Sequence, residues 1–200
     1  MRLGLSKGYP HETGDMMDSF NPPVIEGVAL RLRPVRPDDA AYIHALRMNQ
    51  AYNRHLSPIT GTVDDQRAWI EQYQLREAAG REIYYIIERH DSTRCGTVRL
   101  YEITPDSFIW GSWILDHNKP RKAALESAVL SFGIGFQSLS KDRAFVDVRI
   151  QNKHAEAFYH RLGMTEMYRT AQDIFFVYPR ARFEADSAGY LAILEKEARA

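Results

Sequence analysis

The sequence has only one cysteine, Cys95, so no disulfide can form within the 200-residue chain. It has no CxxC and no HExxH motif, so the spacing of its residues indicates no zinc site, and we predict no bound metal. The simplest interpretation of Cys95 is a buried apolar thiol. These absences exclude a small secreted scaffold that depends on disulfides.

Long hydrophobic runs and an excess of one charge are also missing. Nowhere do 18 apolar residues follow one another, and residues 1–15 lack the apolar segment of a signal peptide. Lys plus Arg and Asp plus Glu number 26 each, so the formal net charge is zero. The sequence therefore predicts a cytoplasmic protein with no membrane partner and no nucleic-acid partner.

The composition that remains is that of an ordinary globular domain. Hydrophobic residues make up 44% of the chain and charged residues 26%. A chain of this length buries roughly 70% of the surface that its unfolded form exposes. We predict a tail or arm over residues 1–24, one domain over residues 25–180 and a C-terminal helix over residues 181–200.

Hydrophobic periodicity predicts a mixed order of strands and helices. Short turns link three central strands, which predicts an antiparallel meander, and a helix between two later strands predicts a parallel crossover. The fold class is therefore mixed α/β (α+β). The expected strands are 28–33, 83–88, 96–102, 107–115, 144–150, 164–169 and 174–178, and the expected helices are 37–48, 62–80, 123–139, 152–163 and 185–199.

The loop that enters the crossover helix is a candidate anion site. A helix N-terminus offers unpaired N–H groups and the positive end of its dipole to an anion. Lys119, Arg121 and Lys122 add positive charge there. Ala123 and Ala124 are small enough for a diphosphate to approach. A basic loop that is only solvated would have the same composition, so the loop alone leaves both interpretations open.

The segment after the crossover resembles the signature of a known family. Residues 148–164 read VRIQNKHAEAFYHRLGM and fill every named position of N-x-x-A-x-x-F-Y-x-x-x-G-[FM] after a strand. This pattern resembles the GNAT superfamily of acyl-CoA-dependent N-acetyltransferases, and the resemblance extends over about residues 28–178. It implies a mostly antiparallel central sheet with helices on both faces. It also implies a splay between the fourth and fifth strands, here 107–115 and 144–150.

The resemblance implies acetyl-CoA as the acyl donor. The pantetheine arm would enter the splay, and the pyrophosphate would lie on the crossover loop. The family's usual loop, [QR]-x-x-G-x-[GA], is altered, because Ala123 and Leu125 stand at its two small positions. A methyl group at Ala123 limits a positive φ and close contact with phosphate. The implied cofactor-binding residues are Ile114, Leu115, Arg121, Lys122, Ala123, Ala124 and Asn152.

Tyr159, Asn152 and His117 are the catalytic candidates. By the resemblance, Tyr159 would protonate the leaving thiolate and Asn152 would hydrogen-bond the arm near the thioester. A phenol with a pKa of about 10 stays protonated at neutral pH and can donate to a thiolate. Alternatively, Tyr159 is a core aromatic and Asn152 only a helix cap. His117 is a candidate base, because imidazole is the side chain that ordinarily gains and loses a proton near neutral pH. Other candidates are Glu102, Asp116, His55 and a water relay.

The first helix and the loop after it bear on the acceptor amine. Residues 46–57 resemble the subgroup that acetylates the 4-amino group of nucleotide-linked amino sugars, and also ribosomal-protein N-terminal acetyltransferases. Arg47, Arg54 and His55 can meet nucleotide phosphates. A peptide would need strand pairing and an acidic or apolar groove. We predict acetyl transfer to a small-molecule amine in a nucleotide sugar. The alternatives are a peptide N-terminus and a non-catalytic acyl-CoA-binding module, and a homodimer is left open.

Overall fold

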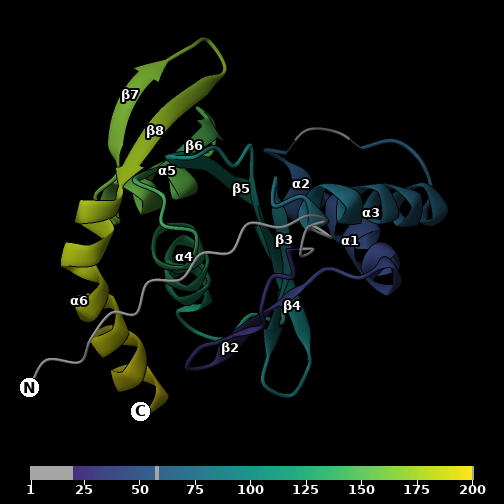
Figure 1. The fold of residues 1–200 in the computed structure, drawn as a ribbon, viewed down its shortest axis with the longest axis horizontal. Coiled ribbons are helices and arrows are strands. Elements are labelled where there is room, and N and C mark those ends of the chain that lie inside the picture. The colour runs from purple at the N-terminus through teal and green to yellow at the C-terminus, as the bar shows by residue number, and fades with distance from the viewer. Residues whose placement is uncertain (1–19, 57–58, 200) are drawn as a thin grey trace, which may run out of the picture.

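A single eight-stranded sheet organises the computed structural model, which describes residues 20–56 and 59–199 (Figure 1). The strand order is β1-β2-β3-β4-β5-β6-β8-β7. All neighbouring strands are antiparallel except β5 and β6, which are parallel. The strands are β1 (Ile25–Glu26), β2 (Leu30–Pro34), β3 (Ile83–Arg89), β4 (Arg94–Tyr101), β5 (Ser107–Leu115), β6 (Arg143–Arg149), β7 (Thr165–Arg169) and β8 (Asp173–Pro179).

Helices cover both faces of this sheet, so the predicted fold class is confirmed. In Figure 1, α1 and α3 lie on one side and α4 and α6 on the other. The helical elements are η1 (Pro37–Asp39), α1 (Ala40–Met48), α2 (Gln50–Asn53), α3 (Val63–Ala78), α4 (Ala123–Gly133), η2 (Ile134–Ser138), α5 (Lys153–Arg161) and α6 (Arg180–Ala198).

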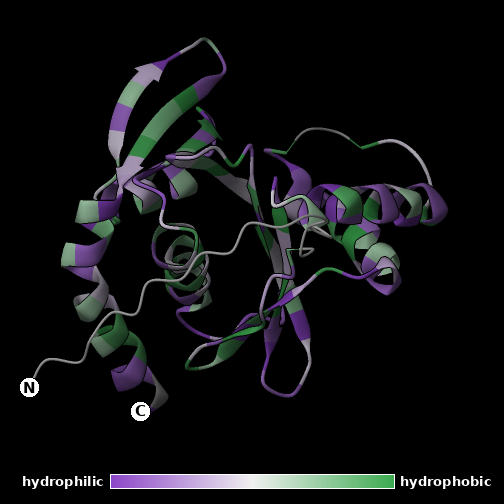
Figure 2. Ribbon diagram, viewed as in Figure 1, coloured by the Kyte–Doolittle hydropathy of each residue, from purple (hydrophilic) through white to green (hydrophobic). Residues whose placement is uncertain are grey.

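The sheet separates two hydrophobic clusters. Successive side chains of a strand point to opposite faces, so Ile83 and Tyr85 of β3 pack in the cluster with α4 and α5. Tyr84 and Ile86 pack on the other face with α1 and α3. Hydrophobic residues concentrate on the central strands, whereas the β3–β4 turn is hydrophilic (Figure 2). Burial on both faces explains why the central strands read as nearly continuous apolar runs.

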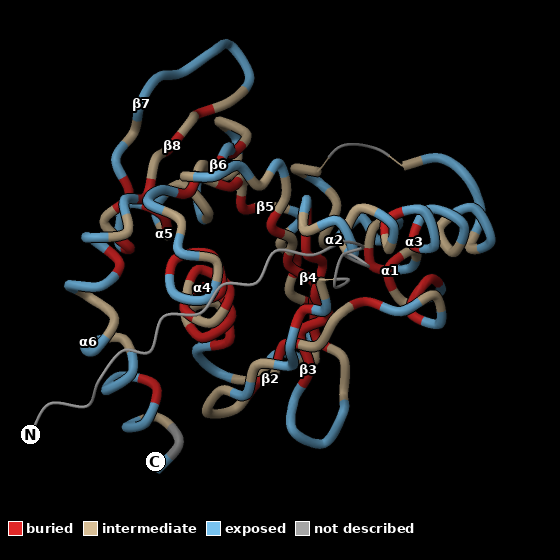
Figure 3. The backbone as a smooth tube through the Cα atoms, in the orientation of Figure 1, coloured by how far each residue is buried: buried red, intermediate tan, exposed pale blue. Residues whose placement is uncertain are grey.

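The crossover helix is shorter than expected. The sequence predicts one helix over 123–139, whereas α4 ends at Gly133 and a π-helical turn, η2, follows. A Cβ atom on Gly135 would overlap the ring of Phe108, so glycine lets this turn approach β5 closely. Helix α4 is buried in the centre of the molecule, while β7 and most of α6 are exposed (Figure 3).

Replacing Gly135 by alanine should therefore lower the free energy of unfolding by about 2 kcal/mol, because the added methyl overpacks a closed core. Gly133→Ala is the matched control, since the nearest atom to its Cβ is 3.5 Å away, on the side chain of Gln137. Alanine there is expected to stabilise the helix by about 0.5–1 kcal/mol. Urea unfolding of both variants measures the difference. Equal stabilities would contradict the close approach at Gly135.

The described part of the N-terminal segment lies against the domain. The backbone N–H of Phe20 donates to the carbonyl of Ala78 at 3.1 Å, and the Tyr85 hydroxyl donates to the carbonyl of Pro23 at 3.2 Å. The predicted tail over residues 1–24 thus has a docked end, and its residues 1–19 lie outside the described residues.

The C-terminal helix α6 begins earlier than its periodicity suggests, at Arg180, and packs on α4 with Phe183 in the core. No helix in the described ranges is both long and apolar enough to cross a membrane. The expectation for Cys95 is confirmed, because its thiol is buried and lies 3.5 Å from the carbonyl of Ile87.

Candidate active site

Strands β5 and β6 pair only at their beginnings and then diverge. Their last pair joins Ile109 and Phe145, although β5 continues to Leu115 and β6 to Arg149. The backbone edges beyond that pair are therefore not used in a ladder between the two strands. The predicted splay is present, and it lies between β5 and β6.

A bulge in β5 accompanies the divergence. Between Thr97 and Arg99 of β4 the pairing with β5 shifts by one residue, and Ser112 of β5 has a φ of 47°. The hydroxyl of Thr97 donates to the carbonyl of Ser112 at 3.0 Å and supports this conformation. A bulge bends the strand that carries the extra residue. The bulge thus lies just beyond Ile109, the last residue of β5 that pairs with β6.

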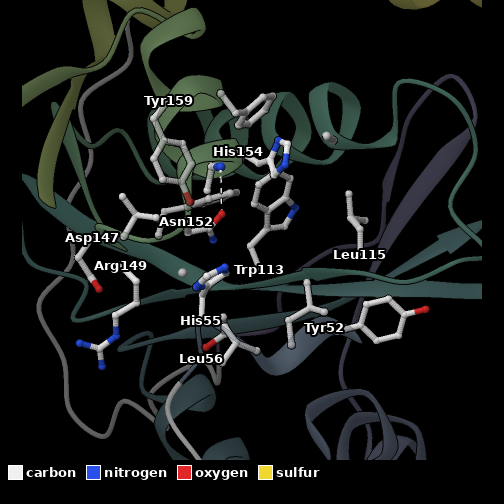
Figure 4. A pocket seen from close by; sticks show the side chains of 18 of the residues that line it. Tyr52, His55, Leu56, Trp113, Leu115, Asp147, Arg149, Asn152, His154 and Tyr159 are labelled. Atoms are coloured by element: carbon white, nitrogen blue, oxygen red, sulfur yellow. Dashed lines mark hydrogen bonds between the residues drawn. The ribbon is translucent and has the colours of Figure 1, made fainter. Parts of the chain in front are cut away.

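The splay opens into a cleft of about 670 Å³, a volume within the usual range for small-molecule sites. Side chains from α5 and its N-terminus face the end of α2 across it, and β6 closes one end (Figure 4). The residues labelled there are Asn152, His154 and Tyr159 on the α5 side, Tyr52, His55 and Leu56 on the α2 side, Asp147 and Arg149 on β6, and Trp113 and Leu115 on β5.

The direction of the β5 backbone decides which of its groups can bind a ligand in the cleft. The N–H of Asp116 donates to the carbonyl of Cys95 in β4 at 2.9 Å. Strand alternation then directs the backbone of Ile114 to β4 as well, and the backbones of Trp113 and Leu115 to the splay. Ile114 lines the cleft, but Trp113 and Leu115 are better placed to bond a pantetheine arm.

The N-terminus of α4 reaches the cleft at Ala124. Its N-cap residue, Lys122, makes no side-chain capping hydrogen bond, so the N–H groups of the first turn that lack a backbone acceptor are suited to a diphosphate. The left-handed residue of the loop is Lys122, with a φ of 60°, whereas Ala123 is helical and buried. The expected conflict between the methyl group of Ala123 and a positive φ is therefore wrong, because that conformation falls one residue earlier.

Arg121 and Lys122 line a second hollow, of about 530 Å³, between the loop and α6. The side chain of Arg121 is 85% exposed, and its Nε lies 2.5 Å from the carboxylate of Glu197. Exposed ion pairs contribute little to stability, so a phosphate can compete for this guanidinium. Neither cation is among the described residues that line the cleft, whereas Ala124, at the start of α4, does line it.

Tyr159 combines a fixed ring with an accessible hydroxyl. Its ring makes edge contacts with Trp110 and Phe176, with centroids 6.1 and 5.7 Å away. No described residue hydrogen-bonds its hydroxyl, which faces the cleft (Figure 4). Burial, and then the negative charge of Asp147, raises the pKa of Tyr159, so the phenol stays protonated near neutral pH. This arrangement suits a proton donor better than a satisfied core tyrosine.

Asn152 caps α5 and lines the cleft at the same time. Its side-chain oxygen accepts the N–H of Ala155 at 3.2 Å, the dashed line in Figure 4. An asparagine whose oxygen is used in a cap still has two amide hydrogens to donate. Those hydrogens are the part of Asn152 that can serve an acyl donor.

The candidate bases are mostly outside the cleft. Of the four side chains considered, His55 lines it, and Glu102, Asp116 and His117 are not among its described lining residues. The hydroxyl of Tyr52 accepts the backbone N–H of His117 at 3.1 Å and lies 3.2 Å from its Nδ1. His117 therefore connects the loop after β5 to α2 through Tyr52. This contact suits a role in holding α2 in position better than a role in proton transfer.

Asp147 is the site residue that the sequence reasoning missed. Val146 and Val148 are buried on the α5 face of β6, so Asp147 points to the other face. Asp147 is exposed to solvent and also lines the cleft. Desolvation of the carboxylate by the surrounding protein, and then the like charge of Asp173, raises the pKa of Asp147. The sequence did contain a signal for Asp147. It is a polar residue in the strand that was expected to separate from the strand at 107–115.

Several known proteins are similar to this chain. A model of the acetyltransferase (GNAT) domain matches residues 29–165. A solved structure described as apo FdhC, a nucleotide-linked sugar GNAT, is 34% identical with a TM-score of 0.78, over 84% of this chain and 96% of that chain.

Two further structures show the fold alone. RimL, a ribosomal L7/L12 alpha-N-protein acetyltransferase in complex with coenzyme A, is 15% identical with a TM-score of 0.69, over 78% of this chain and 98% of that chain. A variant of the spermidine N-acetyltransferase SpeG from Vibrio cholerae is 18% identical with a TM-score of 0.67, over 79% and 98%. None of the curated proteins matches.

Proposed function

The chain belongs to the GNAT family of acyl-CoA-dependent N-acetyltransferases, and we propose that it acetylates the primary amine of a nucleotide-linked amino sugar. The observation that carries the choice of acceptor is the 34% identity with a nucleotide-linked sugar GNAT across 84% of the chain. Family membership accounts for acyl transfer to nitrogen. The nucleotide sugar is the part that needs an experiment.

The α1 and α2 side of the cleft supports an acceptor with phosphates. Arg47 and His55 bring cationic or protonatable groups to it, and Tyr52 adds an aromatic surface. Burial lowers the pKa of Arg47, but a guanidinium stays charged at any physiological pH. Arg54, the third residue expected to meet phosphate, is exposed and is not among the described lining residues.

The other side of the cleft supports the acyl donor. The backbones of Trp113 and Leu115 can pair with the amides of a pantetheine arm, and the first turn of α4 at Ala124 can hold the pyrophosphate. Asn152 would donate to a carbonyl of the arm. Acetyl-CoA supplies a thioester carbonyl as electrophile and a thiolate as leaving group.

Tyr159 would give its proton to that thiolate as the carbon–sulfur bond breaks. Because its pKa is raised, it enters the reaction protonated, and a thiolate beside it is stabilised by the hydrogen bond it donates. The ring contacts with Trp110 and Phe176 hold the hydroxyl in one position. A preoriented donor of this kind lowers the barrier without reorganisation during the reaction.

Release of free thiol from acetyl-CoA, followed with a panel of amines, tests the acceptor. We expect kcat/KM for a UDP-linked 4-amino sugar to be at least about 100-fold higher than for the same amino sugar without its nucleotide, because the cationic groups contribute only to the former. The matched control is the UDP sugar with a hydroxyl in place of the amine. Turnover of peptides alone would replace the proposal with N-terminal acetylation. Donor binding without turnover would favour a binding module.

A further inference from the structure

The cleft has a marked imbalance of charge. Among the described residues that line it, Asp147 has the only carboxylate, beside the guanidinium groups of Arg47, Arg149 and Arg161. A primary amine reaches the enzyme mostly as an ammonium ion at neutral pH, as an ordinary amine pKa near that of lysine implies. An ammonium group in this setting has one carboxylate to pair with.

The fold places Asp147 where the two strands part. It is the first residue on its face of β6 beyond the last pair with β5, which joins Ile109 and Phe145. The equivalent position on β5 is Gly111, which has no side chain to fill the gap. A Cβ there would lie 3.2 Å from the Tyr101 hydroxyl, so this hydroxyl borders the same gap.

Tyr159 reaches the gap from the opposite face of the sheet. Tyr159 belongs to α5 and to the hydrophobic cluster on the α4 and α5 face of the sheet, whereas Asp147 points to the α1 face. Figure 4 shows both side chains at the same end of the cleft. The negative charge of Asp147 contributes to the raised pKa of both Tyr159 and Tyr101, as expected for groups that share one opening. An acyl carbon bound in the splay would therefore lie between the hydroxyl of Tyr159, which is a proton donor, and the carboxylate of Asp147.

We propose that Asp147 binds the ammonium group of the acceptor and accepts the proton that it must lose before attack. The inference rests on the proposed acyl transfer to a primary amine, but it applies to any acceptor of that class. It assigns the base to β6, in place of His117 and the other candidates from the sequence.

The proton balance closes with these two residues. The ammonium loses one proton to Asp147, which releases it to the solvent that reaches its carboxylate. The neutral nitrogen then forms a bond to the thioester carbon, the carbon–sulfur bond breaks, and Tyr159 gives its proton to the sulfur. The second proton from nitrogen restores Tyr159 through water in the gap. One proton is released for each amide formed.

Several groups around Asp147 bear on its titration. Desolvation and the charge of Asp173 raise its pKa, and Arg149, whose guanidinium lies 3.1 Å from the Asp173 carboxylate, acts in the opposite direction. As the pH falls through this raised pKa, Asp147 is protonated and kcat/KM falls. The charged or titratable groups that adjoin it or share its cleft are Arg47 of α1, His55 after α2, Tyr101 of β4, Arg149 of β6, His154, Tyr159 and Arg161 of α5, and Asp173 of β8.

Asp147→Asn in the full chain tests the assignment. We expect kcat/KM for the amine to fall about 100-fold, with the KM for acetyl-CoA nearly unchanged and the acidic limb of the pH profile flattened. Asp147→Glu should restore part of the rate. Asp142→Asn, an exposed residue just before β6, removes the same charge away from the cleft and should behave as wild type. Calorimetry adds a readout without turnover, in which Asp147→Asn should no longer bind the amino sugar more tightly than its hydroxyl analogue.

The outcomes separate this inference from the proposed function. If wild type acetylates the nucleotide-linked amino sugar and Asp147→Asn keeps its rate within threefold and its acidic limb, the assignment of the base is overturned and the acceptor stands. If wild type acetylates only another class of amine, the proposed acceptor is wrong, and wild type and Asp147→Asn are then compared with that amine. If wild type acetylates no amine, both fail.

Discussion

Tyr159→Phe is expected to lower kcat at least about 100-fold while leaving the affinity for acetyl-CoA nearly unchanged. The change removes the hydroxyl that we propose protonates the leaving sulfur, and the loss of a general acid typically slows a reaction by about 10² to 10⁴-fold. The ring stays in place, because its contacts with Trp110 and Phe176 do not involve the hydroxyl. Thiol release gives kcat, and calorimetry with CoA gives the affinity.

Tyr178→Phe is the matched control for this experiment. Tyr178 is also a buried tyrosine packed among aromatic rings, but it lies on β8 outside the lining of the cleft. Removal of its hydroxyl should leave kcat unchanged. A Tyr159→Phe enzyme that loses CoA binding, or one that retains its full kcat, would contradict the assignment of Tyr159 as the acid.

Ala124→Asp is expected to raise the dissociation constant for acetyl-CoA about 100-fold. The substitution places a carboxylate at the point where the first turn of α4 meets the cleft, so it repels a diphosphate there. A loss of about 2.7 kcal/mol corresponds to that factor. An acidic residue in the first turn of a helix is favourable to the helix itself, so the variant should remain folded.

Ala124→Asn separates charge from size, because asparagine and aspartate have nearly the same volume. We expect the Asn variant to bind acetyl-CoA within about tenfold of wild type. The difference between the two variants should shrink as salt is added, since the repulsion is partly screened. Equal losses in both variants, independent of salt, would show that the diphosphate does not dock at Ala124. Both affinities can be measured by calorimetry, with thermal unfolding as the check on folding.

The sequence predicted most of the regular elements because their hydrophobic patterns are local. The strictly alternating segment at 144–150 became β6, and the segment capped by Asn152 and ended by Gly163 became α5. Two short elements were missed. Strand β1 and helix α2 are too short to show a hydrophobic period in the sequence. Both depend on contacts with neighbouring elements, such as the pairing of β1 with β2.

The crossover loop shows where sequence reasoning failed. Alignment to a glycine pattern identified Ala123 as the residue under conformational constraint, whereas the left-handed residue is Lys122. The resemblance also implied backbone contacts from Ile114 and Leu115, and strand register directs the backbone of Ile114 to β4 and that of Leu115 to the splay. A one-residue error matters here because backbone groups in a strand alternate between its two edges.

By itself, the sequence determined the fold class, the order of the elements and the helix that carries Tyr159 and Asn152, because each depends on residues a few positions apart. Only the tertiary structure decided which groups share the cleft. It brought Asp147 of β6 to the gap at Gly111 of β5 and left His117 outside. The reason is that strand register and the bulge at Ser112 set where two distant strands separate, and such contacts leave no local pattern in the chain.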